Sequence, residues 1–288
     1  MKTGNKMKIL SLVLLIMLFM TGCKNKTDDL HIEHIDFESE ILGKKMNLKV
    51  YLPDEYTENI KYPVLYFFPD GGGSVYTVIN QYEIAAKAQK LIYEGRIKPL
   101  IIAAVDIDRS FGVNSADVVE TVETITGKIF EKGRYEDYFI KEIIPFIDSK
   151  YSTDNRKEGR YIGGYSMGGF AALHIALRNP ELFCKAGGHS PSIFTGDFPD
   201  KSVSEFLYPT QSIREERDPI YIIKNNMIED LELFLDVEAG GSPGVKFLYD
   251  TAVENKVAAQ FYILSFSHGR MSCNENMEQY LVFYSGRN

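Results

Sequence analysis

The segment around residues 164–168 contains a serine whose neighbours suit nucleophilic chemistry. It reads GYSMG, a G-x-S-x-G pattern centred on Ser166, with the apolar segment RYIG before it and GFAALHIAL after it. A strand, a sharp turn and a helix form the context in which such a serine acts as a nucleophile, because small neighbours let strand and helix pack closely and free helix N–H groups favour developing negative charge. The alternative is a glycine-rich packing turn. The flanking strand and helix patterns favour the nucleophile.

A nucleophilic serine needs a base, and one histidine has a suitable place. His268 lies in YILSFSHGR, just past the last predicted strand, which matches the chain order serine, acid, histidine. The alternative for it is a surface histidine in a loop. The other four are less suitable: His31 and His34 are expected to precede the fold, His174 lies two turns into the helix and is expected to pack there, and His189 comes too early in the chain, although it can line the pocket.

A tetrahedral oxyanion needs two backbone N–H donors. The residue after the nucleophile, Met167, supplies one, and the loop after an early strand supplies the other. The segment YFFPDGGGS contains that loop, where Gly71 and its neighbours Gly72 and Gly73 let bare backbone approach a ligand. A plain flexible turn is the alternative. Low side-chain bulk directly after a buried strand favours the oxyanion site.

The elements that must position these residues alternate along the chain. Near-continuous apolar runs such as YPVLYFFPD and PLIIAAVDID predict strands buried on both faces. Amphipathic runs between the strands predict helices, including YEDYFIKEIIPFIDSKY, which Pro145 is expected to bend. The pattern predicts an α/β fold with a mostly parallel, doubly wound sheet and helices on both faces, as a single domain over residues 31–288. Residues 194–219 interrupt the alternation and are interpreted as a cap over the pocket or a surface excursion.

The N-terminus predicts export. Three lysines precede an apolar segment that is short for a membrane span, and the segment ends in FMTGCKNK. Residues 1–22 are interpreted as a lipoprotein signal peptide, Cys23 as the lipidated residue, and residues 23–30 as a polar tether; an ordinary secretory signal is the alternative. The lipid would hold the domain on the outer face of a bacterial cell membrane. Of the other two cysteines, Cys184 is expected to be a buried thiol rather than half of a disulfide with Cys273.

Composition sets limits on partners. The formal net charge is −8 over 288 residues, which argues against nucleic acid as a partner, because phosphates attract a basic surface. No CxxC or His/Cys cluster suggests a metal site. We expect neither a metal nor another cofactor.

From about residue 48 onward the chain resembles the putative esterase family of the α/β-hydrolase superfamily. This family includes esterase D, feruloyl and siderophore esterases and the antigen 85 mycolyltransferases, and the segments that carry the resemblance are VYLPDEYTENIKYPVLYFFPDGGG, YEDYFIKEIIPFIDSKY, YIGGYSMGGFAALHIALRNPELF and SFSHGR. The resemblance implies Ser166 as nucleophile, His268 as base and Gly72 N–H as the second oxyanion donor. Asp70, Gly71, Tyr165 and His189 are expected to line the substrate pocket.

Two positions depart from the family pattern. Many members have an aromatic residue where this chain has Arg270, two residues after the histidine. Many also show Gly-x-x-Asp in the loop after the strand LELFLDVE, where this chain reads VEAGGSPG. We choose Glu238, at the strand tip, as the triad acid, with Asp236 as the alternative and Asp250 as a distant third.

Three functions are compatible with these residues. The first is a serine carboxylesterase acting on an extracellular ester, such as an acyl or feruloyl group on a polysaccharide or a siderophore. The second is an acyltransferase of the mycolyltransferase type, and the third is a non-catalytic binding lipoprotein. Hydrolysis of S-formylglutathione, another activity of the family, is disfavoured by the export signal.

Overall fold

The structure is a computed structural model that describes residues 30–117, 120–196, 200–265 and 267–286. Residues His31–Asn288 form one compact unit. The predicted signal peptide, the lipidated Cys23 and the tether up to residue 29 lie outside the described residues. None of the helices in the described ranges has the length and apolarity needed to cross a bilayer.

One eight-stranded sheet organises the compact unit. The strands are β1 (Ile32–Ser39), β2 (Lys44–Tyr51), β3 (Val64–Phe68), β4 (Ile101–Val105), β5 (Arg160–Tyr165), β6 (Lys185–His189), β7 (Glu232–Glu238) and β8 (Ala258–Leu264). Their order in the sheet is β1-β2-β4-β3-β5-β6-β7-β8. Pairing is parallel from β4 through β8 and antiparallel for β1 with β2 and for β2 with β4. The predicted mostly parallel, doubly wound sheet is confirmed.

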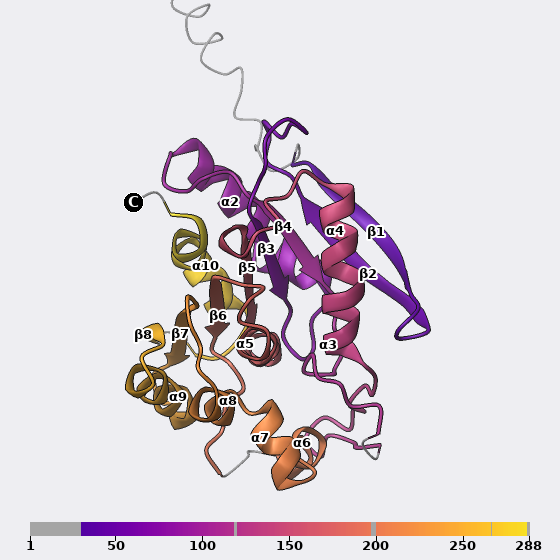
Figure 1. The fold of residues 1–288 in the computed structure, drawn as a ribbon, viewed down its shortest axis with the longest axis vertical. Coiled ribbons are helices and arrows are strands. Elements are labelled where there is room, and N and C mark those ends of the chain that lie inside the picture. The colour runs from indigo at the N-terminus through magenta and orange to yellow at the C-terminus, as the bar shows by residue number, and fades with distance from the viewer. Residues whose placement is uncertain (1–29, 118–119, 197–199, 266, 287–288) are drawn as a thin grey trace, which may run out of the picture. The chain divides into compact units, whose positions relative to one another are not determined.

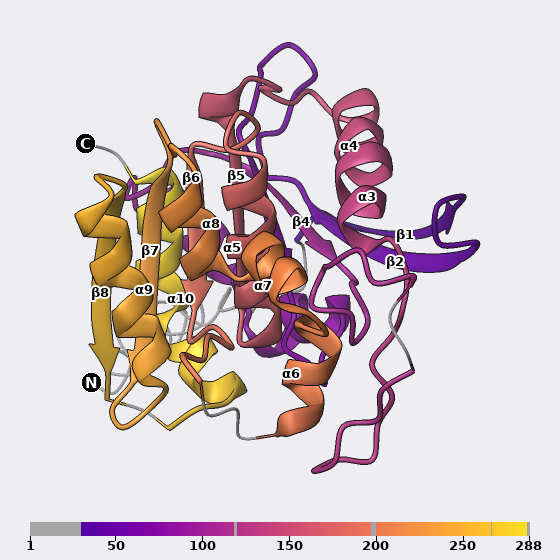
Figure 2. The ribbon, with the colours of Figure 1, turned by 60° about the horizontal axis from the view of Figure 1, so that its bottom comes forward.

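Helices cover both faces of this sheet. They are α2 (Ile84–Tyr93), α3 (Tyr135–Tyr138), α4 (Ile144–Lys150), α5 (Met167–Arg178), α6 (Lys201–Leu207), α7 (Gln211–Arg217), α8 (Pro219–Asn225), α9 (Pro243–Glu254) and α10 (Arg270–Ser285). Figure 1 shows the sheet crossed by these helices, and Figure 2 shows α5, α8 and α9 on one face with α10 on the other. Because β3 and β4 are sandwiched between helical layers, every residue in both strands is buried, which explains their unbroken apolar runs.

Three local features differ from the sequence prediction. Strand β1 was not predicted, and it contains His34, so the expectation that His34 precedes the fold was wrong. Helix α2 was also missed. Around Pro145 the chain stays helical from α3 to α4 through a π-helical turn, Phe139–Ile143. Proline has no N–H to donate to the preceding turn, and the wider turn just before it accommodates that loss.

Candidate active site

Ser166 occupies the turn that joins β5 to α5. Its φ of 56° and ψ of −114° lie outside the ordinary regions for a residue with a side chain, so the backbone there is strained. The flanking glycines make this turn possible. A Cβ on Gly164 would lie 2.3 Å from the carbonyl oxygen of Gly168, and a Cβ on Gly168 would lie 2.4 Å from the carbonyl oxygen of Pro69. Strand, helix and the loop after β3 therefore meet here without room for side chains.

Two hydrogen-bonding contacts connect Ser166 to a carboxylate. Ser166 Oγ lies 3.1 Å from His268 Nε2, and His268 Nδ1 lies 3.1 Å from Glu238 Oε1. The three side chains come from the β5–α5 turn, the segment between β8 and α10, and the last residue of β7. All three lie at the carboxyl edge of the parallel sheet, where ligands of such sheets bind. This geometry allows a serine proton to pass to the imidazole while a carboxylate stabilises the resulting cation.

Glu238 is buried and ionised. Burial alone would raise the pKa of its carboxyl, but hydrogen bonds with His268 and Ser190 outweigh burial and lower that pKa from 4.5 to about 2. Only 6 % of its side chain is exposed, against 53 % for His268. The carboxylate therefore keeps its charge near neutral pH.

The alternative acid, Asp236, contacts a different histidine. Its Oδ2 lies 3.2 Å from His189 Nδ1, and its Oδ1 accepts a 2.8 Å hydrogen bond from Ser190 N–H. The other ring nitrogen of His189 lies 3.0 Å from the hydroxyl of Tyr284. Asp236 and His189 are both completely buried, and burial lowers the pKa of His189. This pair is internal packing beneath the site. Asp250, the third carboxylate considered, is paired with Lys246 on the surface of α9.

In the loop after β3, the N–H of Gly72, the predicted second oxyanion donor, is not free for that role. Gly72 N–H donates a 2.9 Å hydrogen bond to Asp70 Oδ1, so this N–H is already engaged. Gly71 N–H has no such partner among the described residues, and a Cβ on Gly71 would lie 3.6 Å from Met167 Cβ. Met167 opens α5, so its N–H has no carbonyl partner within the helix. Gly71, rather than Gly72, is the glycine whose N–H is available beside Met167.

Two arginines that the sequence did not identify as functional hold this loop. Arg109 donates to the carbonyl of Gly71 and forms a 2.6 Å ion pair with Glu123. Arg270 Nε lies 2.8 Å from Asp70 Oδ2, and its Nη2 donates a 2.7 Å hydrogen bond to the carbonyl of Gly72. The only sequence signal for either was the departure from an aromatic residue at position 270.

Two cavities flank Ser166. One, of about 400 Å³, lies beside Glu238 and His268 and is also lined by residues 239–242 after β7. The other, of about 200 Å³, extends from Gly71 along apolar and charged side chains: Arg109, Phe111, Glu123, Ile125, Phe130, Phe194, Asp200 and Val203. Phe194, Asp200 and Val203 come from the expected cap segment, which contains α6 and α7.

Three of the four residues expected to line the pocket do not line either of these cavities. Gly71 lines the smaller one. Asp70 is held by Arg270 and Tyr82, His189 is completely buried with Asp236, and Tyr165 is 1 % exposed. The expectation for Asp70, His189 and Tyr165 was wrong because each side chain points into a hydrogen-bond network within the fold.

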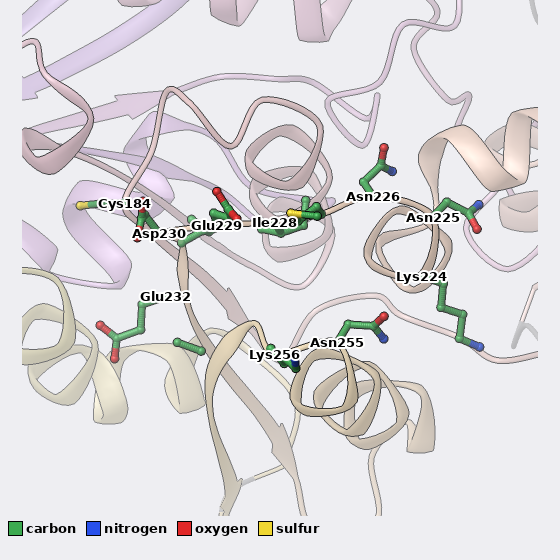
Figure 3. A pocket seen from close by; sticks show the side chains of 13 residues that line it. Cys184, Lys224, Asn225, Asn226, Ile228, Glu229, Asp230, Glu232, Asn255 and Lys256 are labelled. Carbon is green, nitrogen blue, oxygen red and sulfur yellow. The ribbon is translucent and has the colours of Figure 1, made fainter.

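A larger cavity, of about 960 Å³, lies at the opposite edge of the sheet. It is lined by residues that precede β6, β7 and β8, among them Cys184, Glu229, Asp230 and Lys256 (Figure 3). Cys184 and Cys273 are both free thiols, and burial raises the pKa of Cys184 to about 11. The thiol is therefore protonated and a poor nucleophile. None of the predicted catalytic residues lines this cavity.

The fold and the arrangement around Ser166 define a protein of the α/β-hydrolase class. Residues 39–238 match the family model for Esterase, described as putative esterase, and the chain belongs to this family of carboxylic ester hydrolases. Over 158 residues it is 32 % identical to an endo-1,4-beta-xylanase/feruloyl esterase of Xylanibacter ruminicola, covering 53 % of this chain and 20 % of that protein. Over 177 residues it is 28 % identical to an esterase of Mycobacterium tuberculosis, covering 59 % of this chain and 35 % of that protein.

Solved structures show the same fold. A ferulic acid esterase superposes with a TM-score of 0.72 at 18 % identity, covering 89 % of this chain and 98 % of that one. A fluorophosphonate-binding serine hydrolase of Staphylococcus aureus superposes with a TM-score of 0.70 at 18 % identity, covering 88 % and 98 %. The match to the first curated relatives thus spans about a third of their length or less, whereas the structural match spans nearly the whole domain.

Proposed function

We propose that this chain is a serine carboxylesterase that cleaves its substrate through an acyl-enzyme on Ser166. The observation that carries the proposal is the pair of 3.1 Å contacts from Ser166 Oγ to His268 Nε2 and from His268 Nδ1 to Glu238 Oε1. A serine, a base and a buried ionised carboxylate in this order are the working parts of a hydrolytic triad.

The reaction proceeds in two halves. His268 Nε2 takes the Ser166 proton as Oγ attacks the ester carbonyl, and the same proton then passes to the leaving alkoxide oxygen as the carbonyl–oxygen bond breaks. Water repeats the sequence on the acyl-enzyme and releases the acid. The N–H groups of Met167 and Gly71 stabilise the tetrahedral oxyanion in both halves, and no cofactor is required.

The two cavities receive the two sides of the ester. The leaving oxygen must reach His268 Nε2, so the alcohol lies in the cavity of about 400 Å³ beside that ring. The acyl group lies in the cavity of about 200 Å³, where Phe111, Phe130 and Phe194 provide aromatic surface. This lining supports an aromatic acyl group such as feruloyl, carried on a polysaccharide. The feruloyl esterase named among the relatives supports the same choice.

We place the enzyme outside the cell, tethered by lipid on Cys23. The support is the sequence pattern of lysines, apolar segment and TGC. In the producing bacterium, Cys23→Ser should appear unprocessed or move out of the membrane fraction. A Cys23→Ser protein that still fractionates wholly with membranes and carries lipid contradicts the anchor.

The central experiment compares the wild-type protein with Ser166→Ala. The wild type should hydrolyse p-nitrophenyl acetate and react with a fluorophosphonate probe, and Ser166→Ala should do neither while keeping its thermal transition. Methyl ferulate should then be a better substrate than methyl acetate by kcat/KM. An unreactive wild type, or an active Ser166→Ala, overturns the esterase mechanism, whereas equal kcat/KM for the two methyl esters overturns only the aromatic acyl group.

A further inference from the structure

We propose that Tyr165 is a positioning residue that fixes Glu238 and the His268 loop relative to each other. The inference rests on the proposed function, because it assigns a role within the same triad. Tyr165 precedes the nucleophile in the chain and ends strand β5. Its side chain is 1 % exposed, so it acts on the triad and not on substrate.

The hydroxyl of Tyr165 bonds both sides of the acid–base pair. It donates a 2.9 Å hydrogen bond to Glu238 Oε1, the same oxygen that faces His268 Nδ1 at 3.1 Å. It also accepts a 2.8 Å hydrogen bond from the N–H of Gly269, the residue that follows the base. The ring stacks on the His268 imidazole with centroids 5.1 Å apart and an interplanar angle of 29°. One side chain thus contacts the acid, the base and the backbone that carries the base.

The need for such a contact follows from the choice of acid. A glutamate has one more rotatable bond than an aspartate, so its carboxylate can adopt more positions unless a donor fixes it. The side chain of His268 is 53 % exposed, so burial alone does not fix the position of its ring. The hydroxyl of Tyr165 restrains the Glu238 carboxylate and, through the N–H of Gly269, the segment that carries His268.

The hydroxyl is suited to donate at every working pH. Burial raises the pKa of Tyr165 far above its ordinary value, and the nearby Glu238 charge raises it further, although the Gly269 N–H opposes them. The phenol therefore stays protonated and cannot accept a proton from Ser166. Its contribution is limited to geometry and to stabilising the carboxylate.

The test is a double-mutant cycle with Tyr165→Phe and Glu238→Gln. Tyr165→Phe keeps the stacked ring and should lower kcat about 10- to 100-fold, with KM changed less than about twofold, because the loss falls on the transition state. The same change should lower the fluorophosphonate labelling rate about 10- to 100-fold in the wild-type background but less than about threefold in a Glu238→Gln background, because the carboxylate that the hydroxyl positions is gone. Tyr161→Phe, at the other end of β5, is the matched control and should stay within about twofold of wild type.

The outcomes separate this inference from the proposed function. If the two substitutions lower the labelling rate by independent factors, or if Tyr165→Phe alone keeps kcat near wild type, Tyr165 does not act through Glu238 and the inference is overturned. Those results leave the esterase mechanism standing as long as Ser166→Ala is inactive. Thermal unfolding of each variant checks that a lost rate is not a lost fold.

Discussion

Arg270 and Asp70 join the segment that carries His268 to the loop that carries Gly71, the proposed oxyanion donor. Their ion pair, with Nε 2.8 Å from Oδ2, spans 200 residues of sequence. Asp70 also accepts hydrogen bonds from Tyr82 and from Gly72 N–H, and although burial alone would raise the pKa of its carboxyl, these partners and Arg270 lower it. The ion pair thus clamps the segment that carries His268 to the loop after β3.

Removing the Arg270–Asp70 ion pair should lower kcat while leaving the free energy of unfolding nearly unchanged. Arg270→Gln loses the ion pair and its hydrogen bond to the Gly72 carbonyl, so the oxyanion loop and His268 can shift apart. We expect kcat to fall about 10-fold, because small misplacements of reacting groups are costly. Steady-state kinetics with p-nitrophenyl acetate measures the change. Arg156→Gln, which removes an exposed ion pair with Asp154, is the control, and an equal effect in both variants argues against a specific clamp.

The two carboxylates on β7 should respond differently to neutralisation. Glu238→Gln should lower kcat about 10²- to 10⁴-fold with little change in KM, because the imidazolium loses its stabilising charge. Asp236→Asn should leave kcat near wild type and lower the free energy of unfolding by about 1–3 kcal/mol, because it weakens a buried network with His189 and Ser190. Kinetics and urea unfolding of both variants measure this contrast. The reverse pattern would move the triad acid to Asp236.

The tight turn at the nucleophile should not tolerate a methyl group. Gly168→Ala would bring a Cβ within 2.4 Å of the Pro69 carbonyl oxygen and 2.6 Å of the Phe68 carbonyl oxygen, so backbone must move. We expect a lower melting temperature and loss of most activity. Among the described residues no heavy atom lies within 4 Å of a Cβ added at Gly196, so Gly196→Ala should be neutral in both assays. A stable, active Gly168→Ala would mean that helix and loop are less closely packed than the structure has them.

The charge of Glu238 should also affect how the free energy of unfolding changes at acidic pH. Its pKa in the folded state, about 2, lies below the ordinary 4.5, so its ionised form stabilises the fold above about pH 4.5, and this contribution is lost as the pH falls toward 2. Between these pH values the wild type should therefore lose stability more steeply than Glu238→Gln. Denaturant unfolding of the two proteins across that range measures the difference. Parallel curves would show that Glu238 has the same pKa folded and unfolded.

Local sequence patterns were sufficient to predict much of the fold. The apolar runs of β3 and β4 and the helix after Ser166 follow from periodicity, because both signals are complete within a short segment. Glu238, chosen as the carboxylate nearest the expected loop, lies within reach of His268 because β7 and β8 pair in register from Glu232 with Ala258 to Glu238 with Leu264.

The missed features depend on contacts between distant segments. Strand β1 is a half-buried edge strand whose alternation is weak until its pairing with β2 is known. The proposed second oxyanion donor depends on a side-chain contact. Asp70 accepts a hydrogen bond from the N–H of Gly72, so the N–H of Gly71 is the one that stays available. Tyr165 was expected to line the pocket, yet its hydroxyl is directed to Glu238, which is 73 residues away. Spacing within one segment contains no information about such partners.

Keeping the acid on the last residue of β7 has a consequence for how this enzyme can diversify. The loop that follows, residues 239–242, lines the cavity of about 400 Å³ beside Glu238 and His268 but supplies no member of the proposed triad. Its length and composition can therefore change under selection, or in a library, without moving a catalytic group. In a relative with its acid in that loop, the same insertions would displace the carboxylate. Residues that line the cavity and residues proposed to transfer protons are therefore separate in this part of the chain. Residues 239–242 are the place to begin when the substrate preference is to be changed.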